Sequence, residues 1–435
     1  MIRVAYDASV LGMGYLNPKA RTGIFRMVEA LLLELVAHSN LEIKVISFDS
    51  ESTFWDNIGT SLYIKNLYPS LAKNFQSVYS SRFNLYALYT HVVTWQRSLI
   101  KASTPDRIWL YKSARAMQIL FEKVARLDME AQFHSASFDL YHSLYYPLPS
   151  RAITGNISRI LTVHDLIPVL FPQFVIPRVY QRCVATLNSI DRDRDWIICN
   201  SQYTKQDFCE YTGMDGDRVF VTPLAAADFF QPVTDTALIA STLQRHQIPN
   251  YPYLLSLATL EPRKNLGFLI RCFSQIIQDA PALDLNLVLV GVSGWQTAEI
   301  FQAARHNPQL RSRIIFTGYL PDRDLSAIYS GATAFVYPSL YEGFGLPPLE
   351  AMQCGTPVIT ASTSSLPEVV GDAGILIDPT QEDDLCQAIL NVMHDAQRRA
   401  DLSQRATQRA SQFSWASCAQ QTAEIYQTAA ANSSQ

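Results

Sequence analysis

Two glutamates separated by seven residues stand in the most informative stretch of the chain, residues 337–350, which reads YPSLYEGFGLPPLE. Glu342 lies on a glycine-punctuated loop after an apolar strand, and we expect Glu350 in the first turn of the next helix. Prolines are tolerated at such a helix start, because first-turn N–H groups have no intrahelical partner. Carboxylates at the carboxyl end of a parallel strand suit the binding of hydroxyl groups. We therefore expect Glu350 to bind a ribose and Glu342 to hold a sugar.

The start of the expected helix offers a second kind of binding group. The backbone N–H groups of Phe344, Gly345 and Leu346 have no helical partners there, so they can meet sugar or phosphate oxygens. A loop whose glutamate caps the helix and whose glycines only form the turn would give the same pattern. The combination of the loop with both glutamates favours a ligand site.

A cationic pair, Arg263–Lys264, occurs in LEPRKN between the apolar strand Tyr253–Ala258 and the helical pattern Leu266–Asp279. The pair therefore lies at the carboxyl end of a strand, as Glu342 does. Negative charge grows on a diphosphate group as its bond to a sugar breaks, and two fixed cations stabilise that charge without proton transfer. A solvated basic turn is the common alternative, but the location favours a catalytic role for Arg263 and Lys264.

The first half of the chain contributes two further candidates. His164 follows the apolar run Arg159–Val163 in LTVHDLIP. It is either a buried histidine bonded by its neighbours or a group that contacts a sugar or phosphate. Gly23 opens the helical pattern Gly23–Ala37, where its amide is placed to meet a phosphate.

Strand-like and helix-like segments alternate along the chain, which predicts α/β domains whose parallel sheets are covered by helices. We predict two doubly wound domains, at residues 1–230 and 253–413. Prolines flank a short helical piece between them, so residues 231–252 are expected to be a linker. Residues 414–435 are expected to form an appended helix and a tail. The pattern at residues 382–411 predicts one long helix.

An unusual insertion is expected at about residues 57–130. Residues 61–130 hold ten Lys and Arg against four Asp and Glu, and eleven aromatic residues. Such a segment is either a helix pair with inward-facing aromatics or a surface that contacts anionic lipid or an acceptor saccharide.

Composition excludes several classes of protein. The chain has 435 residues, of which 48% are hydrophobic and 17% are charged, as expected for a soluble protein with sizeable cores. Its net charge of −4 argues against a nucleic-acid-binding protein. The seven cysteines form no C-x-x-C pair, which indicates reduced thiols. We find no signal peptide and no apolar run long enough to span a bilayer, so a cytoplasmic location is expected.

The run of alternating charges at residues 191–195, DRDRD, offers a competing interpretation. Alternating aspartates can imitate a D-x-D manganese site. This run precedes an apolar strand, however, whereas a metal-binding D-x-D normally ends one. We therefore expect a charged turn and no metal site.

The stretches at residues 257–265 (LATLEPRKN) and 339–355 resemble the donor domain of the retaining, group 1 glycosyltransferases (family 4). VHDLIP and FSWASCA are similar to the mannosyltransferase-like branch that acts in bacterial surface polysaccharide synthesis. The resemblance covers residues 253–428 and patches of the first domain. It implies a GT-B fold, in which two Rossmann-like domains face a deep cleft and the last helix crosses back to the first domain. It also implies transfer with retention of anomeric configuration and without a metal ion.

The resemblance assigns roles to residues of the second domain. Arg263 and Lys264 would bind the donor diphosphate, Glu342 the donor sugar and Glu350 the ribose, while His164 of the first domain would face the sugar. Contacts to the base are implied for four consecutive residues, Thr317, Gly318, Tyr319 and Leu320.

The resemblance also implies contacts near the phosphates. The amides of Phe344, Gly345 and Leu346 would meet sugar or phosphate, and Gly23 would approach the phosphate and the acceptor. Many relatives have a more glycine-rich turn where this chain has Phe25, which we expect to narrow the acceptor entrance.

The expected donor is a nucleotide-diphosphate sugar, and no other cofactor is expected. GDP-mannose is the first choice, and a UDP-linked sugar or GDP-fucose is nearly as plausible. The acceptor would be a saccharide or a lipid-linked sugar, with peripheral membrane contact through residues 61–130. A sugar-nucleotide epimerase and a non-catalytic subunit of a polysaccharide-assembly complex remain alternatives.

Overall fold

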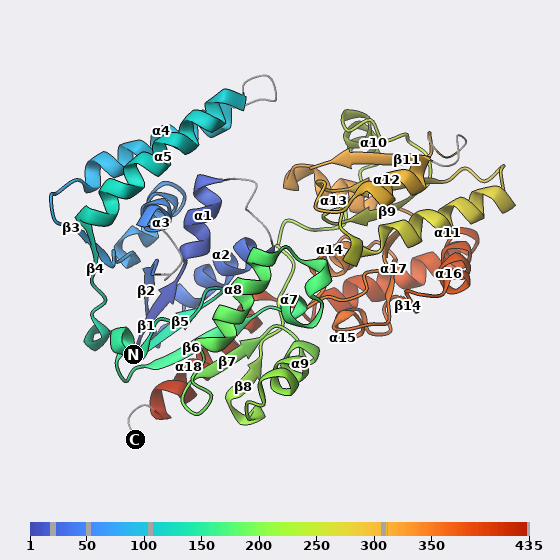
Figure 1. Ribbon diagram of the computed structural model, residues 1–435. Coiled ribbons are helices and arrows are strands. Elements are labelled where there is room, and N and C mark those ends of the chain that lie inside the picture. The colour runs from blue at the N-terminus through green and yellow to red at the C-terminus, as the bar shows by residue number, and fades with distance from the viewer. Residues whose placement is uncertain (18–22, 49–53, 103–107, 306–309, 311, 433–435) are drawn as a thin grey trace.

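The computed structural model describes residues 1–17, 23–48, 54–102, 108–305, 310 and 312–432. These residues form two α/β domains that stand side by side (Figure 1). Each domain is built on a parallel sheet of six strands, so the predicted fold class is confirmed.

The first sheet has the strand order β2-β1-β5-β6-β7-β8. Its strands are β1 (Ile2–Asp7), β2 (Leu41–Ile46), β5 (Leu140–Ser143), β6 (Ser158–Val163), β7 (Trp196–Cys199) and β8 (Val219–Val221). All residues of the central strands β5, β6 and β7 are buried, because helices cover both faces of a parallel sheet. The helices of this domain are α1 (Ser9–Leu16), α2 (Gly23–Val36), α6 (Arg151–Thr154), α7 (Ile167–Leu170), α8 (Pro177–Asn188) and α9 (Gln202–Thr212).

The second sheet has the order β11-β10-β9-β12-β13-β14. Its strands are β9 (Tyr253–Leu257), β10 (Asn286–Val290), β11 (Ile314–Gly318), β12 (Ala334–Tyr337), β13 (Val358–Ala361) and β14 (Ile375–Ile377). The chain runs outward from β9 to β11 and then returns to the other side of β9 as β12. The switch point of this sheet therefore lies between β9 and β12, where doubly wound folds bind ligands.

The helices of the second domain cover both faces of its sheet. They are α10 (Thr236–Arg245), α11 (Leu266–Asp279), α12 (Ala298–Arg305), α13 (Asp322–Ser330), α14 (Leu346–Gln353), α15 (Leu366–Val370), α16 (Glu382–His394) and α17 (Ala396–Ala410). The prediction of one long helix at residues 382–411 is wrong. The helix breaks at Asp395, whose backbone is extended and whose side chain accepts a hydrogen bond from the amide of Arg398 at 2.8 Å. Aspartate is a favoured N-cap residue, so α17 begins there.

The predicted linker contains α10, which packs against α13 of the second domain. Arg245 Nη1 lies 2.6 Å from Asp324 Oδ1, and His246 Nε2 lies 2.9 Å from Asp324 Oδ2. Two contacts to one nearly buried carboxylate fix this segment to the second domain.

The last helix, α18 (Trp415–Asn432), packs on the first domain against α2, β1, β5 and β6. Figure 1 shows it beneath the first sheet. The hydroxyl group of Tyr426 lies 2.6 Å from His142 Nδ1, and Ser158 Oγ donates to the carbonyl group of Ala429 at 2.7 Å. Burial lowers the pKa of His142 to about 3, so this contact is made by a neutral ring.

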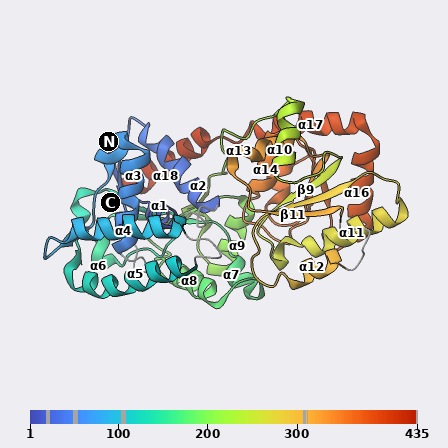
Figure 2. The ribbon, with the colours of Figure 1, turned by 90° about the horizontal axis from the view of Figure 1, so that it is seen from above.

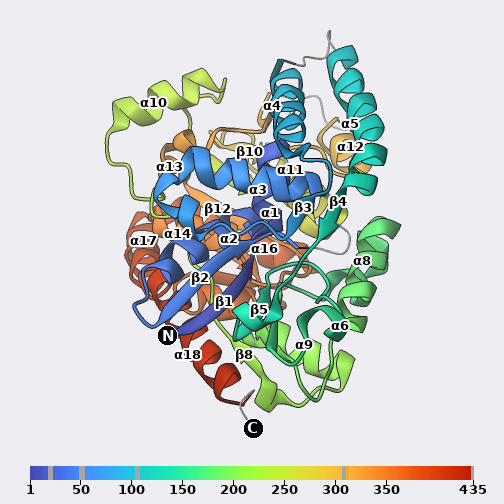
Figure 3. The same cartoon turned by 90° about the vertical axis from the view of Figure 1, so that its left-hand side faces the viewer.

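The insertion forms α3 (Phe54–Leu67), α4 (Tyr86–Ala102) and α5 (Ile108–Asp128), with a short antiparallel pair, β3 (Tyr79–Ser81) and β4 (Met129–Ala131). Figures 2 and 3 show α4 and α5 side by side as an arm on the first domain. We call these two helices the arm. Its aromatic residues divide between two environments: Tyr89 is buried, whereas Trp95 and Trp109 are 50% and 59% exposed. Inward packing therefore explains only part of the aromatic content.

In the described part of the insertion and the first domain, short 3₁₀ helices lie on four connections: η2 (Pro69–Asn74), η4 (Ser135–Ser137), η5 (Pro172–Phe174) and η6 (Gly216–Arg218).

Candidate active site

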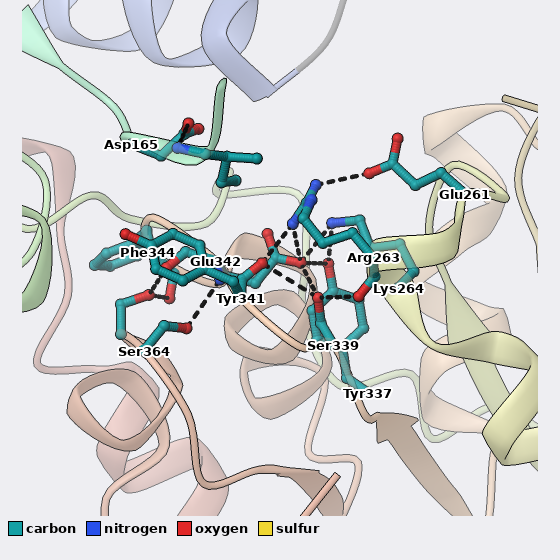
Figure 4. Close-up of polar contacts among 12 residues, drawn as sticks. Asp165, Glu261, Arg263, Lys264, Tyr337, Ser339, Tyr341, Glu342, Phe344 and Ser364 are labelled. Carbon is teal, nitrogen blue, oxygen red and sulfur yellow. Dashed lines mark hydrogen bonds and ion pairs between the residues drawn. The ribbon is translucent and has the colours of Figure 1, made fainter. Parts of the chain in front are cut away.

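The switch point of the second sheet brings the cationic pair and the first glutamate together. β9 leads to a 3₁₀ helix, η7 (Pro262–Lys264), and β12 leads to the loop that carries Glu342. Arg263 Nη1 and Lys264 Nζ lie 2.9 and 2.6 Å from the same oxygen atom, Glu342 Oε1 (Figure 4). Two adjacent cations thus form one cluster with a carboxylate that lies at least 78 residues further along the chain.

Hydrogen bonds fix Glu342 further. Two hydroxyl groups donate to Glu342 Oε1: that of Ser339 at 2.6 Å and that of Tyr337 at 3.0 Å. The amide of Glu342 donates to Ser364 Oγ at 2.9 Å. The hydroxyl group of Tyr337 also accepts from Lys264 Nζ at 2.8 Å. A carboxylate held on several sides can position a ligand, but it has little freedom to move toward a reacting atom.

Electrostatics keep this cluster ionised. Burial alone would raise the pKa of Glu342, but Arg263 and Lys264 overcome that effect and lower the pKa to about 2. Burial lowers the pKa of Lys264, and Glu342 partly offsets this. Burial also acts to lower the pKa of Arg263, but Glu342 and Glu261 raise it above its usual value. Since Glu261 Oε1 lies 2.7 Å from Arg263 Nη2, a bound diphosphate would share its cations with two carboxylates.

The second glutamate, Glu350, occupies a separate position on α14. Because α14 begins at Leu346, Glu350 lies in its second turn, and the predicted place in the first turn is wrong. Its Oε1 lies 3.2 Å from Arg26 Nη1, and its Oε2 accepts a hydrogen bond from Tyr329 at 3.0 Å. Burial raises the pKa of Glu350 to about 7, although Arg26 acts in the opposite direction. Arg26 also lies 2.6 Å from Asp322 Oδ1, so it binds two carboxylates of the other domain.

The loop before α14 takes a conformation that favours glycine. Gly345 is the N-cap residue with φ of +123°, and no side chain caps the helix. Ser365 Oγ donates to the carbonyl groups of Glu342 and Phe344 at 2.9 and 2.7 Å, and these two hydrogen bonds fix the backbone of the loop. Phe344 is buried and packs against Phe413, with ring centroids 5.9 Å apart. The start of α14 is thus rigid and carries no capping carboxylate that would compete with an anionic ligand.

The same loop touches the first domain at Gly343. A Cβ atom at this position would lie 2.0 Å from the carbonyl oxygen of His164, so only glycine allows the approach. The carbonyl group of Gly343 accepts hydrogen bonds from Ser201 Oγ at 2.7 Å and Thr204 Oγ1 at 3.0 Å. The glycines of the EGFG run, residues 342–345, indicated a tight loop, but the sequence did not reveal that Gly343 contacts the first domain.

His164 lies at the end of β6 and faces a cavity of about 490 Å³. Its Nε2 lies 2.7 Å from the carbonyl group of Leu144, and burial lowers its pKa to about 4, so the neutral ring donates from Nε2. Arg263 lines the same cavity from the second domain, as does Trp295, a residue that the sequence did not single out. The structure thus places His164 near the cationic pair.

Of the four residues expected at the base, Thr317 and Gly318 end the outer strand β11, and Tyr319 and Leu320 follow it. Gly318 has φ of +72°, Leu320 is buried and Tyr319 is 69% exposed. Thr317 Oγ1 donates to the carbonyl group of Gly318 at 3.0 Å. The turn therefore presents the ring of Tyr319 to solvent, while the neighbouring Leu320 is buried.

Gly23 begins α2 and faces the second domain. A Cβ atom there would lie 3.2 Å from Leu346 Cδ1, so the starts of α2 and α14 approach each other closely. Phe25 does not narrow an entrance as expected. Its side chain is buried and packs edge-on against Tyr63, with ring centroids 5.5 Å apart. Residues 18–22, which precede this helix, lie outside the described residues.

The aspartate-rich run at residues 191–195 forms a turn. Asp195 is buried between Arg151 Nη2 at 2.6 Å and Arg159 Nε at 2.9 Å, so this carboxylate serves an internal ion-pair network. Among the described residues, no three or more His, Cys, Asp or Glu side chains are grouped as a metal ion would require.

Known sequences resemble this chain in both halves. The family model for glycosyl transferases group 1 matches residues 241–409. The O-antigen chain mannosyltransferase B of Escherichia coli is 33% identical over 294 residues, which cover 68% of this chain and 73% of that protein. The serotype-specific mannosyltransferase WbdA of Escherichia coli is 33% identical over 286 residues, 65% of this chain but 35% of that longer protein.

Solved structures resemble it over nearly the whole chain. HepE of Anabaena in complex with UDP has a TM-score of 0.62 at 19% identity, and the match covers 98% of this chain and 100% of HepE. At this level of identity the likeness concerns the fold.

Proposed function

Because the chain belongs to the group 1 glycosyltransferases, we propose that it moves a hexose from a nucleotide-diphosphate sugar to a saccharide or lipid-linked acceptor with retention of anomeric configuration. Its two six-stranded domains have the GT-B fold. The observation that carries the proposal is the cluster of Arg263, Lys264 and Glu342 at the switch point between β9 and β12. The mannosyltransferase relatives favour a role in cell-surface polysaccharide synthesis.

The cluster suits a front-face substitution that needs no protein nucleophile. The bond from the sugar C1 to the diphosphate oxygen breaks through an oxocarbenium-like state, and the acceptor oxygen bonds to C1 from the same face. The acceptor proton passes to the departing diphosphate oxygen. Arg263 and Lys264 hold the growing negative charge on the diphosphate, where fixed cations in a dry site are most effective. Glu342, fixed by its four partners on Oε1, positions the sugar hydroxyl groups.

The proposed ribose site combines Glu350 with Arg26. A pKa of about 7 for Glu350 would leave a sizeable protonated fraction at neutral pH, and Arg26 favours the ionised form. An ionised carboxylate accepts hydrogen bonds from both ribose hydroxyl groups, as the acidic residue of dinucleotide folds does. Arg26 is therefore a positioning residue supplied by the first domain.

GDP-mannose remains our first choice of donor because the sequence relatives are mannosyltransferases, and a UDP-linked sugar or GDP-fucose is the next. A thermal-shift screen with GDP, UDP, ADP and dTDP sugars tests this choice, and GDP-mannose should give the largest rise in melting temperature. NMR of the product should show the same anomeric configuration as the donor. An inverted product would end the front-face mechanism, and loss of transfer in EDTA would contradict metal independence.

The two alternatives give different products. A sugar-nucleotide epimerase would convert the donor in the absence of an acceptor, whereas a transferase requires one for a new glycoside. A non-catalytic subunit would bind no donor at all. One assay with and without a saccharide acceptor, analysed by mass spectrometry and NMR, separates the three.

The arm supports peripheral contact with an anionic lipid surface at a cytoplasmic location. Trp109, Leu120 and Leu127 lie on one face of α5 and are 59%, 65% and 73% exposed. Residues 86–128 hold seven Lys and Arg against three Asp and Glu, and basic amphipathic helices of this kind lie on membranes. No helix in the described ranges has the length and apolar character needed to cross a bilayer.

Co-sedimentation with vesicles tests this contact. Binding to anionic vesicles should fall in Leu120→Glu, and the exposed Leu238→Glu on α10 of the second domain is the matched control. Equal binding of both variants, or no preference for anionic over neutral vesicles, would exclude the arm as a lipid contact.

A further inference from the structure

A cavity of about 490 Å³ lies beside the cationic cluster. Its lining contains a polar group of residues, which we call the polar end (His164, Asp165, Glu261 and Arg263), and an aliphatic group, which we call the aliphatic wall (Val175, Ile176, Val179 and Leu187). We infer that this cavity binds the acceptor, and that its aliphatic wall takes an apolar aglycone or carrier group attached to the acceptor sugar. The inference rests on the proposed transferase function and adds the chemical class of the acceptor.

The polar end lies where a retaining front-face reaction needs the acceptor. In that reaction the acceptor hydroxyl group must lie next to the departing diphosphate oxygen, which receives its proton. Arg263 holds the diphosphate in the proposed mechanism and also lines the cavity, together with Glu261, His164 and Asp165. An acceptor hydroxyl group at this end would therefore reach the diphosphate.

A further part of the lining, including Val179 and Leu187 of the aliphatic wall, comes from one face of α8. Its lining residues are Val179, Arg182, Cys183, Thr186 and Leu187, which recur at the three- and four-residue spacing of a helix face. No residue of this 12-residue helix is buried, although a helix on a domain surface normally buries one face. The inner face of α8 thus borders a cavity that protein atoms do not fill.

The residues before α8 extend the aliphatic surface. Phe174, Val175 and Ile176 line the cavity, and Ile176 is 50% exposed. Arg182 is directed toward aromatic rings: its Nη1 donates to the hydroxyl group of Tyr145 at 3.3 Å, and its guanidinium lies 5.7 Å from the centroid of Tyr146.

This chemistry selects against sugar hydroxyl groups on the wall and for hydrocarbon. A hydroxyl group that faces only Val175, Val179 and Leu187 would lose hydrogen bonds to water without finding a partner, unlike one that reaches Arg182 or Thr186 on the same face of α8. A methylene buried there would instead tighten binding by about fourfold. The sugar ring itself would lie toward the polar end, and Trp295 of the second domain, which also lines the cavity, offers it an apolar ring face.

The inference can be tested by binding, apart from catalysis. The probes are methyl and octyl α-D-mannopyranoside below the micelle concentration, titrated calorimetrically in the presence of GDP. If two or more methylenes are buried, the octyl glycoside should bind at least about 15-fold more tightly than the methyl glycoside. The variant Val179→Asp should remove this advantage, whereas Ala185→Asp, on the exposed side of the same helix, should keep it.

A second variant guards against misfolding. Ile176→Asp changes a side chain that is already half exposed, so the fold should tolerate it, and it should also remove the octyl advantage. Equal affinity for the two glycosides, or an octyl advantage that survives in Val179→Asp and Ile176→Asp, would overturn the inference. Failure of the proposed function shows separately, as absence of donor binding or of transfer from any sugar nucleotide.

Discussion

Lys264→Ala is the substitution that most directly tests the cationic cluster. The Nζ of Lys264 lies 2.6 Å from Glu342 Oε1, and its side chain is only 11% exposed. At an effective dielectric constant of about 20, two unit charges about 4 Å apart interact by about 4 kcal/mol. The loss of one fixed donor from a site that stabilises developing charge costs about 2.7–4 kcal/mol in known enzymes. Both figures predict a fall in kcat of about 100- to 1,000-fold.

The fold should survive this change, because Glu342 keeps Arg263 at 2.9 Å and Ser339 at 2.6 Å. The assay is initial-rate transfer at saturating donor, with the melting temperature measured in parallel. Lys44→Ala is the matched control, since Lys44 pairs with Glu42 on β2 of the first sheet and should leave kcat unchanged. A kcat for Lys264→Ala near that of the control protein would refute the proposed role of the cation.

Three further substitutions probe the second glutamate and the contact between the domains. Glu350→Ala should mainly weaken donor binding in calorimetry, and unchanged affinity would exclude the ribose role. Because the folded-state pKa of Glu350 is raised from 4.5 to about 7, the group's contribution to stability is fully present below pH 4.5 and is lost as pH rises through about 7. In denaturant titrations, the free energy of unfolding of the wild type should therefore fall by up to about 3 kcal/mol more than that of Glu350→Gln between pH 4.5 and about 7. If the free energies of the two proteins change in parallel with pH, the assigned pKa is contradicted. Gly343→Ala should lower kcat by more than tenfold with little change in far-UV circular dichroism, because its Cβ would lie 2.0 Å from the carbonyl oxygen of His164 and must push the loop away; an unchanged kcat would show that the loop position does not matter.

The sequence could predict that Arg263 and Glu342 lie at the same edge of a parallel sheet, because this depends only on which residues follow each strand. Arg263 and Glu342 each follow an apolar strand, and parallel strands end at the same edge of a sheet. The strand order, which puts β9 next to β12, was not visible, and neither was the break before α17. Asp395 carried a signal for that break, but the continuous helical pattern on both sides outweighed it.

Residues that act across the domain boundary could not be found from the sequence. Arg26 lies 324 positions from Glu350 in the sequence. Trp295 and α8 line the same cavity, but no sequence motif links them. Their partners are set by how two separately folded domains meet, which no local pattern encodes. Phe25 was misplaced for a related reason: it turns into the core against Tyr63, a residue of the insertion that the family resemblance did not cover.

The contacts between the domains bear on the same two glutamates that the sequence singled out. The loop of Glu342 is packed through Gly343 against the backbone of His164, and Glu350 is paired with Arg26. Glu368 adds a third contact, since its carboxylate accepts hydrogen bonds from the amides at the start of α9 at 2.8 and 2.6 Å. Each proposed donor-binding carboxylate of the second domain therefore takes part of its environment from the first domain. Separation of the domains would change the surroundings of both glutamates at once, so the proposed donor site is complete only while the two domains are in contact.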